Sequence, residues 1–308
     1  MQLEMRNIEK SFGPKEVLKG VSLKAQGGRA LGLLGRNGAG KTTSIRIIMN
    51  VFPPNAGDIL FDEKPIDYSQ VQFGYLPEER GLYAKQKIMD QLLYFAQLKG
   101  MSRKAAQESI TYWLDRLAMT DYKDQKLETL SKGNQQKIQL ITALAHDPQV
   151  LILDEPFTGL DPVNARLLED VVREEIQKGK IVLFSSHQMA YVETFCDHIA
   201  ILNGGKIVLE GDLESIKRSY PRNRLIVKSP ERAKILADLG KQYEISQDKD
   251  RLLISLPTED AKAEVMEALA RNYNIDAISV LEPSLNDIFV QYAGDPPAED
   301  KTSEEARA

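Results

Sequence analysis

The chain has 308 residues, enough for two domains or for one large domain with an appendage, and its 42% hydrophobic and 28% charged residues are typical of a soluble globular protein. The net charge of −5 leaves no basic excess to neutralise phosphates, so nucleic acid is not expected as a partner. The single cysteine, Cys196, excludes an internal disulfide, and no run approaches 18 apolar residues, which excludes a membrane-spanning helix.

Apolar patterns predict short strands and one helix in the first 76 residues. Strands are expected at residues 2–8, 17–23, 58–61 and 73–76. The continuous apolar run at 30–34 predicts a buried strand, and residues 42–49 predict a helix with Ile45 and Ile48 on one face. A glycine-rich segment therefore connects a buried strand to a helix.

That connecting segment has the spacing G-x-x-x-x-G-K-[ST] of a phosphate-binding loop. Glycines let the backbone fold closely around an anion, so that amide N–H groups and the helix N-terminus point at phosphate oxygens. Lys41 would reach the β- and γ-phosphates, and the Thr42 hydroxyl would ligate Mg²⁺. The sequence thus predicts nucleoside triphosphate binding by Gly35, Arg36, Asn37, Gly38, Ala39, Gly40, Lys41, Thr42 and Thr43.

A helical pattern extends from residue 88 to residue 149, and a second candidate anion site lies within it. Ser131, Lys132, Gly133 and Asn134 precede a helix that carries apolar residues at 138 and 141. The Ser131 hydroxyl and the Gly133 amide can face an anion in front of a positive helix terminus. A serine N-cap explains Ser131 equally well.

Two acids follow the apolar strand expected at 150–153. Apolar neighbours cannot stabilise the adjacent carboxylates of Asp154 and Glu155, so a cation is expected at the end of the strand. The candidate is Mg²⁺ on the triphosphate, which Asp154 would hold from outside its first coordination sphere or through a water. Glu155 is then placed to polarise an attacking water. The alternative is a solvated acidic turn.

Two further polar positions follow along the chain. Asp161 stands just before Pro162, which opens the helix expected at 162–177, and taken alone it is a helix N-cap. His187 follows the strand expected at 181–184, at the edge where open α/β sheets bind ligands. We therefore expect His187 to contact a γ-phosphate or a water, although a lone histidine is more often structural.

The C-terminal part predicts a second, smaller domain. A helix at 189–196 and a hairpin of 199–202 with 206–209 are followed by a linker at 219–223. The expected order beyond the linker, βαββαβ plus a closing helix, suggests a ferredoxin-like α+β domain. The sequence therefore predicts domains at 1–218 and 223–293 and a disordered acidic tail at 294–308.

These motifs, in this order, resemble the ATP-binding subunits of ABC transporters over roughly residues 1–217. The resemblance implies an α/β P-loop NTPase core with a helical subdomain at about 87–145, and ATP with Mg²⁺ as ligands. It also implies a Walker A loop at 35–42, a Walker B strand ending at Asp154, and Glu155 as catalytic base. A signature at 130–134, a D-loop around Asp161 and His187 as the switch histidine complete the set. Phe12 lies where the family stacks an aromatic ring on adenine, with core packing as the alternative.

Two motifs depart from the family pattern. The signature is usually L-S-G-G-Q, whereas Lys132 and Asn134 stand here for a glycine and the glutamine. Both keep or add hydrogen-bond donors toward phosphate, unless Lys132 points to solvent. In the Q-loop, Glu78 takes the place of glutamine. A carboxylate is a good ligand for Mg²⁺, but it adds negative charge beside the γ-phosphate, so slower turnover or stronger metal dependence is expected.

The run at 77–83, the S-K-G signature and the C-terminal ending at 282–289 look like the bacterial exporter branch, which includes sodium-efflux (NatA-like) and drug-resistance subunits. The resemblance implies a head-to-tail dimer with a second copy or a homologous ATPase subunit, each signature closing on the other's γ-phosphate. It also implies integral membrane permease subunits, which would contact Glu79, Arg80, Leu82 and Tyr83. The protein is then expected in the cytoplasm, peripheral at the inner face of the cell membrane through the permease subunits.

Two other functions remain as alternatives at this point. A soluble ABC protein acting on ribosomes or DNA usually carries two motif sets, long coiled-coil insertions or basic arms, whereas this chain has one set and an acidic balance. A regulatory ATP-binding module with slow hydrolysis is disfavoured by the presence of Glu155 and His187, although Glu78 leaves room for it.

Overall fold

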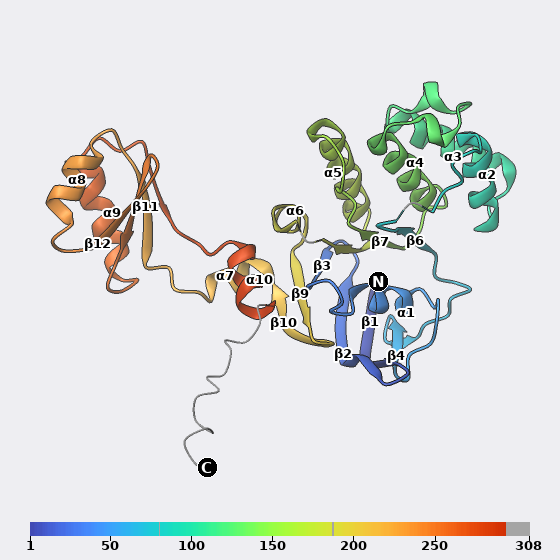
Figure 1. The fold of residues 1–308 in the computed structure, drawn as a ribbon, viewed down its shortest axis with the longest axis horizontal. Helices are drawn as coiled ribbons and strands as arrows, with labels where there is room; N and C mark the ends of the chain where they lie inside the picture. Colours follow the sequence, from blue (N-terminus) through green and yellow to red (C-terminus); the bar gives the residue numbers. More distant parts are fainter. Residues whose placement is uncertain (80, 187, 294–308) are drawn as a thin grey trace, which may run out of the picture. The chain divides into compact units, whose positions relative to one another are not determined.

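The computed structural model describes residues 1–79, 81–186 and 188–293, so Arg80, His187 and the expected tail at 294–308 lie outside the described residues. The chain divides into two compact units (Figure 1). The larger contains Met1–Leu213 and the segment that begins at Phe289, and the smaller is Glu214–Ile288. Within the described ranges, no helix has both the length and the apolar character needed to cross a membrane.

The larger unit is built on a six-stranded sheet with the order β10-β9-β3-β8-β7-β6. Its strands are β3 (Ala30–Leu34), β6 (Phe73–Leu76), β7 (Val150–Asp154), β8 (Ile181–Ser185), β9 (His198–Asn203) and β10 (Lys206–Asp212). All but β10 run parallel. Every residue of β3, β7 and β8 is buried, which explains their continuous apolar sequences. The carboxyl ends of the parallel strands therefore meet at one edge, where open α/β sheets bind ligands.

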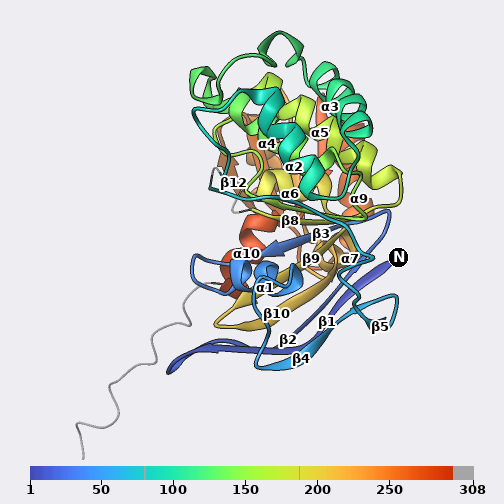
Figure 2. The same cartoon turned by 90° about the vertical axis from the view of Figure 1, so that its right-hand side faces the viewer.

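A second, antiparallel sheet covers one side of helix α1 (Lys41–Ile48). Its order is β2-β1-β4-β5, from β1 (Gln2–Phe12), β2 (Lys15–Gln26), β4 (Ala56–Phe61) and β5 (Lys64–Pro65). Ile45, Ile47 and Ile48 of α1 are buried in one apolar cluster with residues of β1, β2 and β3, so α1 packs between the two sheets (Figure 2). β1 and β2 are longer than the sequence predicted, because Gly13, with a φ of 58°, allows a two-residue turn between Phe12 and Lys15.

Three helices form a group beside β6 and β7 in Figure 1: α2 (Ile88–Leu98), α3 (Arg103–Arg116) and α4 (Lys132–Leu144). Short 3₁₀ turns at Thr120–Tyr122 and Leu127–Thr129 connect α3 to α4. The apolar faces that the sequence predicted are buried, including Trp113 and Leu114 of α3 and Ile138 and Ile141 of α4. Helices α5 (Pro162–Gln177) and α6 (Met189–Phe195) complete the layers around the sheet.

The smaller unit has the βαββαβ order that the sequence predicted. Its elements are β11 (Arg224–Lys228), α8 (Arg232–Leu239), β12 (Glu244–Asp248), β13 (Arg251–Ser255), α9 (Ala261–Asn272) and β14 (Ala277–Val280). The strands form an antiparallel sheet with the order β12-β13-β11-β14, as in ferredoxin-like domains. The remaining helices are α7 (Leu213–Arg218), which the sequence analysis did not predict, and α10 (Leu285–Ala293).

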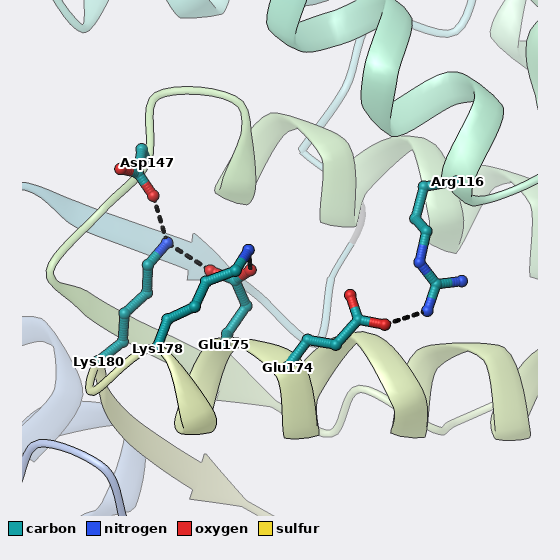
Figure 3. A network of polar contacts seen from close by, with 6 residues as sticks. All are labelled: Arg116, Asp147, Glu174, Glu175, Lys178 and Lys180. Atoms are coloured by element: carbon teal, nitrogen blue, oxygen red, sulfur yellow. Dashed lines mark hydrogen bonds and ion pairs between the residues drawn. The ribbon is translucent and has the colours of Figure 1, made fainter.

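An ion-pair network lies around the buried Glu175 at the carboxyl end of α5 (Figure 3). Glu175 is fully buried and pairs with Lys178, at 2.7 Å, and with Lys180. The ammonium of Lys180 also pairs with the Asp147 carboxylate at 2.6 Å, on the segment between α4 and β7. Lys180 therefore joins the end of α5 to the segment that returns from the helical group.

Helix α3 meets the same end of α5 through two more contacts. Arg116 pairs with Glu174, and the ammonium of Lys178 lies over the Trp113 ring, 5.8 Å from its centroid. Because these contacts tie α3 to α5, the helical group is anchored to the core at this point as well as through its chain connections.

The network yields a stability prediction. Lys180→Met leaves the buried Glu175 carboxylate with Lys178 as its remaining ion-pair partner in the network. We expect the larger unit to lose about 2 kcal/mol of unfolding free energy, less than for a buried charge left without a partner, because Lys178 still pairs with Glu175. Urea unfolding followed by the fluorescence of Trp113, the single tryptophan, measures this. The exposed Lys123→Met is the control, and equal stability of both variants would contradict the prediction.

Candidate functional site

The glycine-rich loop leaves β3 along a path that only glycine permits. Gly38 and Gly40 have φ values of 82° and 115°, and a Cβ atom on Gly40 would lie 2.6 Å from Cδ2 of Leu18. A Cβ atom on Gly35 would lie 2.5 Å from the carbonyl oxygen of Leu202. Gly40 occupies the N-cap of α1, where no side chain caps the helix, so the first-turn amides face the loop. This arrangement is typical of an anion site.

Lys41, the first residue of α1, folds back onto the loop. Its Nζ donates hydrogen bonds to the carbonyl oxygens of Gly35, at 2.6 Å, and Arg36, at 3.4 Å. Burial lowers the pKa of the Lys41 ammonium, and three neighbouring carboxylates act in the opposite direction. Those carboxylates belong to Glu155, Asp154 and Glu78. The ammonium therefore occupies a partly desolvated place in which the nearby side-chain charges favour its protonated form.

Asp154 and Glu155 stand at the carboxyl end of β7 with only 4% and 6% of their surfaces exposed. Burial raises the pKa of the Asp154 carboxyl, and the charges of Glu78 and Glu155 raise it further. Glu155 has a φ of 50°, which is uncommon for a residue other than glycine. Backbone strain of this kind clusters at functional sites.

Two hydrogen bonds to the end of β8 fix Glu155. Its backbone N–H donates to the carbonyl oxygen of Ser185, at 2.9 Å, and its Oε2 accepts from Oγ of the buried Ser186, at 3.0 Å. The role of Ser186 in holding this carboxylate was not predicted from the sequence. Its position directly after a buried strand, at the same sheet edge as Glu155, was the available signal.

A groove of about 860 Å³ lies beside β6, between residues of α1 and α4, and Thr42, Glu78 and Asp154 all line it. A hydroxyl and two carboxylates are the hard oxygen ligands that Mg²⁺ prefers. Among the described residues, no group of three His, Cys, Asp or Glu side chains could hold a metal by itself. The residues therefore fit an ion that takes its other ligands from phosphate oxygens and water, as Mg²⁺ does in nucleotide sites.

Phe12 is the last residue of β1, and the strand that pairs with β1 reaches the glycine-rich loop. The carbonyl oxygen of Val17, on the strand paired with β1, lies 3.4 Å from the Cβ position of Gly40. Phe12 is 50% exposed and meets the Phe52 ring edge-on, with 5.5 Å between centroids and 86° between planes. The ring is therefore available for contact with a ligand and does not belong to the buried core.

The segment with Ser131, Lys132, Gly133 and Asn134 begins helix α4. Ser131 is the N-cap, and its Oγ accepts from the Asn134 N–H at 3.3 Å. The Cβ position of Gly133 is 3.4 Å from Nδ2 of Asn164. The start of α4 therefore packs against the start of α5 within the same chain.

Asp161 is the N-cap of α5. Its Oδ1 accepts from the Val163 and Asn164 N–H groups, both at 3.0 Å, and its Oδ2 accepts from Asn164 Nδ2 at 2.5 Å. Gln136 of α4, which the sequence analysis did not single out, donates from Nε2 to the carbonyl oxygen of Pro156 at 3.2 Å. These contacts bring the segments around 131–136 and 156–164 together. His187 lies outside the described residues.

The chain is similar to known proteins over both of its units. Residues 18–158 match the protein family described as "ABC transporter", and residues 211–293 match "ATP-binding protein DrrA1-3-like, C-terminal domain". The uncharacterized ABC transporter ATP-binding protein YhaQ of Bacillus subtilis (strain 168) is 41% identical over 293 residues, which are 95% of this chain and 98% of that protein.

Two other similarities add to this. Nod factor export ATP-binding protein I of Burkholderia lata is 35% identical over 213 residues, 68% of this chain and 70% of that protein. A solved structure of an ATP-binding subunit of an ABC transporter, 29% identical, superposes with a TM-score of 0.65 and covers 71% of this chain and 93% of that one.

The path of the glycine-rich loop yields a prediction on two neighbouring glycines. A Cβ atom on Gly38 would have no atom within 4 Å. Gly38→Ala should therefore lower the free energy of unfolding by only about 1 kcal/mol, because alanine disfavours the left-handed backbone conformation of this position. Gly40→Ala has the same backbone strain and also a clash with Leu18, so it should lower the free energy of unfolding by about 3 kcal/mol. Urea unfolding followed by Trp113 fluorescence compares the two, and an equal loss would show that Leu18 does not confine the loop.

Proposed function

The chain belongs to the ATP-binding proteins of ABC transporters, and we propose that it couples ATP binding and hydrolysis in a head-to-tail dimer to export through separate membrane subunits. Membership confirms the predicted fold class, an α/β P-loop NTPase core joined to a ferredoxin-like domain, and the predicted ATPase activity. One observation carries the proposal: the Lys41 ammonium, the start of α1 and three carboxylates converge at one sheet edge.

In the proposed site, the loop amides of residues 35–40 and the first turn of α1 hold the phosphates of ATP. Lys41 exchanges its bonds to the loop carbonyl oxygens for bonds to phosphate oxygens, which are charge-assisted and stronger. Thr43 adds a donor in the same turn. Thr42, Asp154 and Glu78 would hold Mg²⁺, which neutralises phosphate charge when bound.

Glu155 is the proposed general base for the attacking water. The Ser186 hydroxyl and the Ser185 carbonyl hold Glu155 beside Lys41, so its carboxylate is oriented before ATP arrives. We propose that His187, the next residue after Ser186, contacts the γ-phosphate.

The proposed partner across the site is a second copy of the chain or a homologous ATPase subunit. The capped start of α4, with Ser131, Lys132, Gly133 and Asn134, offers helix-terminal donors to the γ-phosphate held by the other subunit. Asp161 would lie at the same interface, because the start of α5 packs against the start of α4. A head-to-tail pair then contains two such composite sites.

ABC ATP-binding subunits work with membrane components, and we propose integral permease subunits as the partners here. Tyr83 supports a contact beside Glu78, because its ring is 54% exposed and stacks on Phe95 of α2 at 6.0 Å. Glu79, Leu82 and Arg80 would share that contact. The protein would then lie on the cytoplasmic side of the cell membrane, held by the permease. The export function named for the Burkholderia relative supports this direction of transport.

We also propose the domain boundaries at 1–218 and 223–293, with a helical subdomain at about 87–145. The compact unit Glu214–Ile288 and the C-terminal family match at 211–293 support the second domain. The span of α2 to α4, from Ile88 to Leu144, supports the subdomain.

Glu155→Gln tests the proposed chemistry. The substitution keeps the shape and removes the base, so ATP binding should remain while kcat falls by about 100-fold or more. An ATP-dependent dimer should then accumulate, because bound ATP is no longer hydrolysed. Coupled ATPase assays and size-exclusion chromatography with ATP measure both effects. The exposed Glu108→Gln on α3 is the matched control, and full kcat in Glu155→Gln would contradict the assignment.

Glu78→Gln tests the departure in the Q-loop. Removing a negative charge beside the γ-phosphate should keep or raise kcat, whereas the loss of a charged Mg²⁺ ligand should raise the Mg²⁺ concentration needed for half-maximal activity. Titrating Mg²⁺ in the ATPase assay measures this, with Glu79→Gln as the neighbouring control. Loss of all ATP binding in Glu78→Gln would show that the assignment of Glu78 to the Q-loop position is wrong.

A further inference from the structure

A cation and a second ring flank Phe12. The Nζ of Lys10 lies over the Phe12 ring, 5.3 Å from its centroid, and over the Phe52 ring, 5.0 Å from its centroid. The two rings meet edge to face, and Phe12 remains half-exposed. The same Nζ donates a hydrogen bond to the carbonyl oxygen of Pro53 at 2.6 Å. The ring is therefore supported by Lys10 and Phe52 and keeps an exposed surface.

Lys10 lies on β1, whereas Phe52 and Pro53 belong to the segment that follows α1. The Asn55 N–H donates to the carbonyl oxygen of Glu9 at 2.8 Å, and Asn55 Oδ1 accepts from the Ser11 N–H at 2.8 Å. These bonds join the segment to β1 immediately before Phe12. Helix α1 therefore has the phosphate loop at its amino end and the support of the aromatic ring just beyond its carboxyl end.

We propose that Lys10 and Phe52 are positioning residues that hold the Phe12 ring for stacking on the base of the bound nucleotide, and that the Lys10 ammonium strengthens this stacking. The inference rests on the proposed function, because Phe12 meets a base only if residues 35–43 hold its triphosphate. The group that stacks on the Phe12 ring is an adenine, and Lys10 contacts the ring and not the adenine itself.

Two physical effects support the role of Lys10. A cation over an aromatic ring attracts its π electrons, which leaves the ring poorer in electrons and better suited to stack on an electron-rich purine. A ring that is already fixed also loses less freedom when the base binds. Among the described residues, no carboxylate forms an ion pair with Lys10, which is anchored by a carbonyl oxygen instead, so its charge stays available to both rings.

The test compares ATP with inorganic tripolyphosphate, which has the phosphates but no base. Calorimetric titration in the presence of Mg²⁺ gives both affinities for the full chain. Lys10→Met should weaken ATP binding by about two- to five-fold, the range for one cation–π contact, and leave tripolyphosphate binding unchanged. Lys10→Arg should keep the ATP affinity, since a guanidinium also lies well over rings. Lys64→Met, on exposed β5 of the same sheet, is the matched control.

Two more variants separate positioning from general charge. Phe52→Leu should weaken the binding of ATP and leave the binding of tripolyphosphate unchanged. In a chain that already carries Phe12→Leu, Lys10→Met should cause no further loss of ATP affinity, because the ring is absent. Equal loss of both ligands in Lys10→Met would overturn the inference, because it would show attraction of Lys10 to the phosphates. Unchanged ATP affinity would overturn it too. If the unaltered chain bound neither ATP nor tripolyphosphate, the proposed nucleotide site would be contradicted. That result differs from the two outcomes that contradict the role of Lys10 alone.

Discussion

The site depends on one electrostatic constraint: a single ammonium, that of Lys41, stands among three carboxylates at the end of buried apolar strands. Burial disfavours the charges of Lys41 and Asp154, and the three carboxylates outnumber the ammonium. A further cation near the carboxylates and new acceptors for Lys41 would therefore stabilise this edge. The magnesium-bound triphosphate that we propose as the ligand would supply both. The parallel sheet creates the constraint, since β6, β7 and β8 end at the same edge as β3 and the glycine-rich loop.

Two helices connect this edge to the rest of the larger unit. Helix α1 joins the phosphate loop to the segment that supports Phe12, so base and phosphates would be held by one rigid element. Helix α5 begins at the Asp161 cap, beside the start of α4, and ends in the network of Glu175 and Lys180 (Figure 3). Helix α5 therefore contacts the helical group at both of its ends.

The sequence predicted the elements whose signals are local. Strand β3 and helix α5 have the predicted bounds, since a continuous apolar run and a capped, proline-initiated helix are unambiguous. The six-residue helix α7 was missed because it is too short to show a period. Contacts such as Ser186 with Glu155, Gln136 with Pro156 and Lys10 with Pro53 could not be predicted, since they join segments 20 to 43 residues apart through packing. Ser131 and Asp161 are both N-caps, and their roles across a subunit interface stay predictions.

The most direct measurement is the equilibrium affinity of the Lys41→Ala chain for ATP in the presence of Mg²⁺. Lys99→Ala, which removes a lysine that lines the groove beside β6, is the control. We expect an affinity at least about 30-fold below that of the unaltered chain, because a desolvated charge-assisted contact to phosphate is lost. An unchanged affinity in Lys41→Ala would contradict the account.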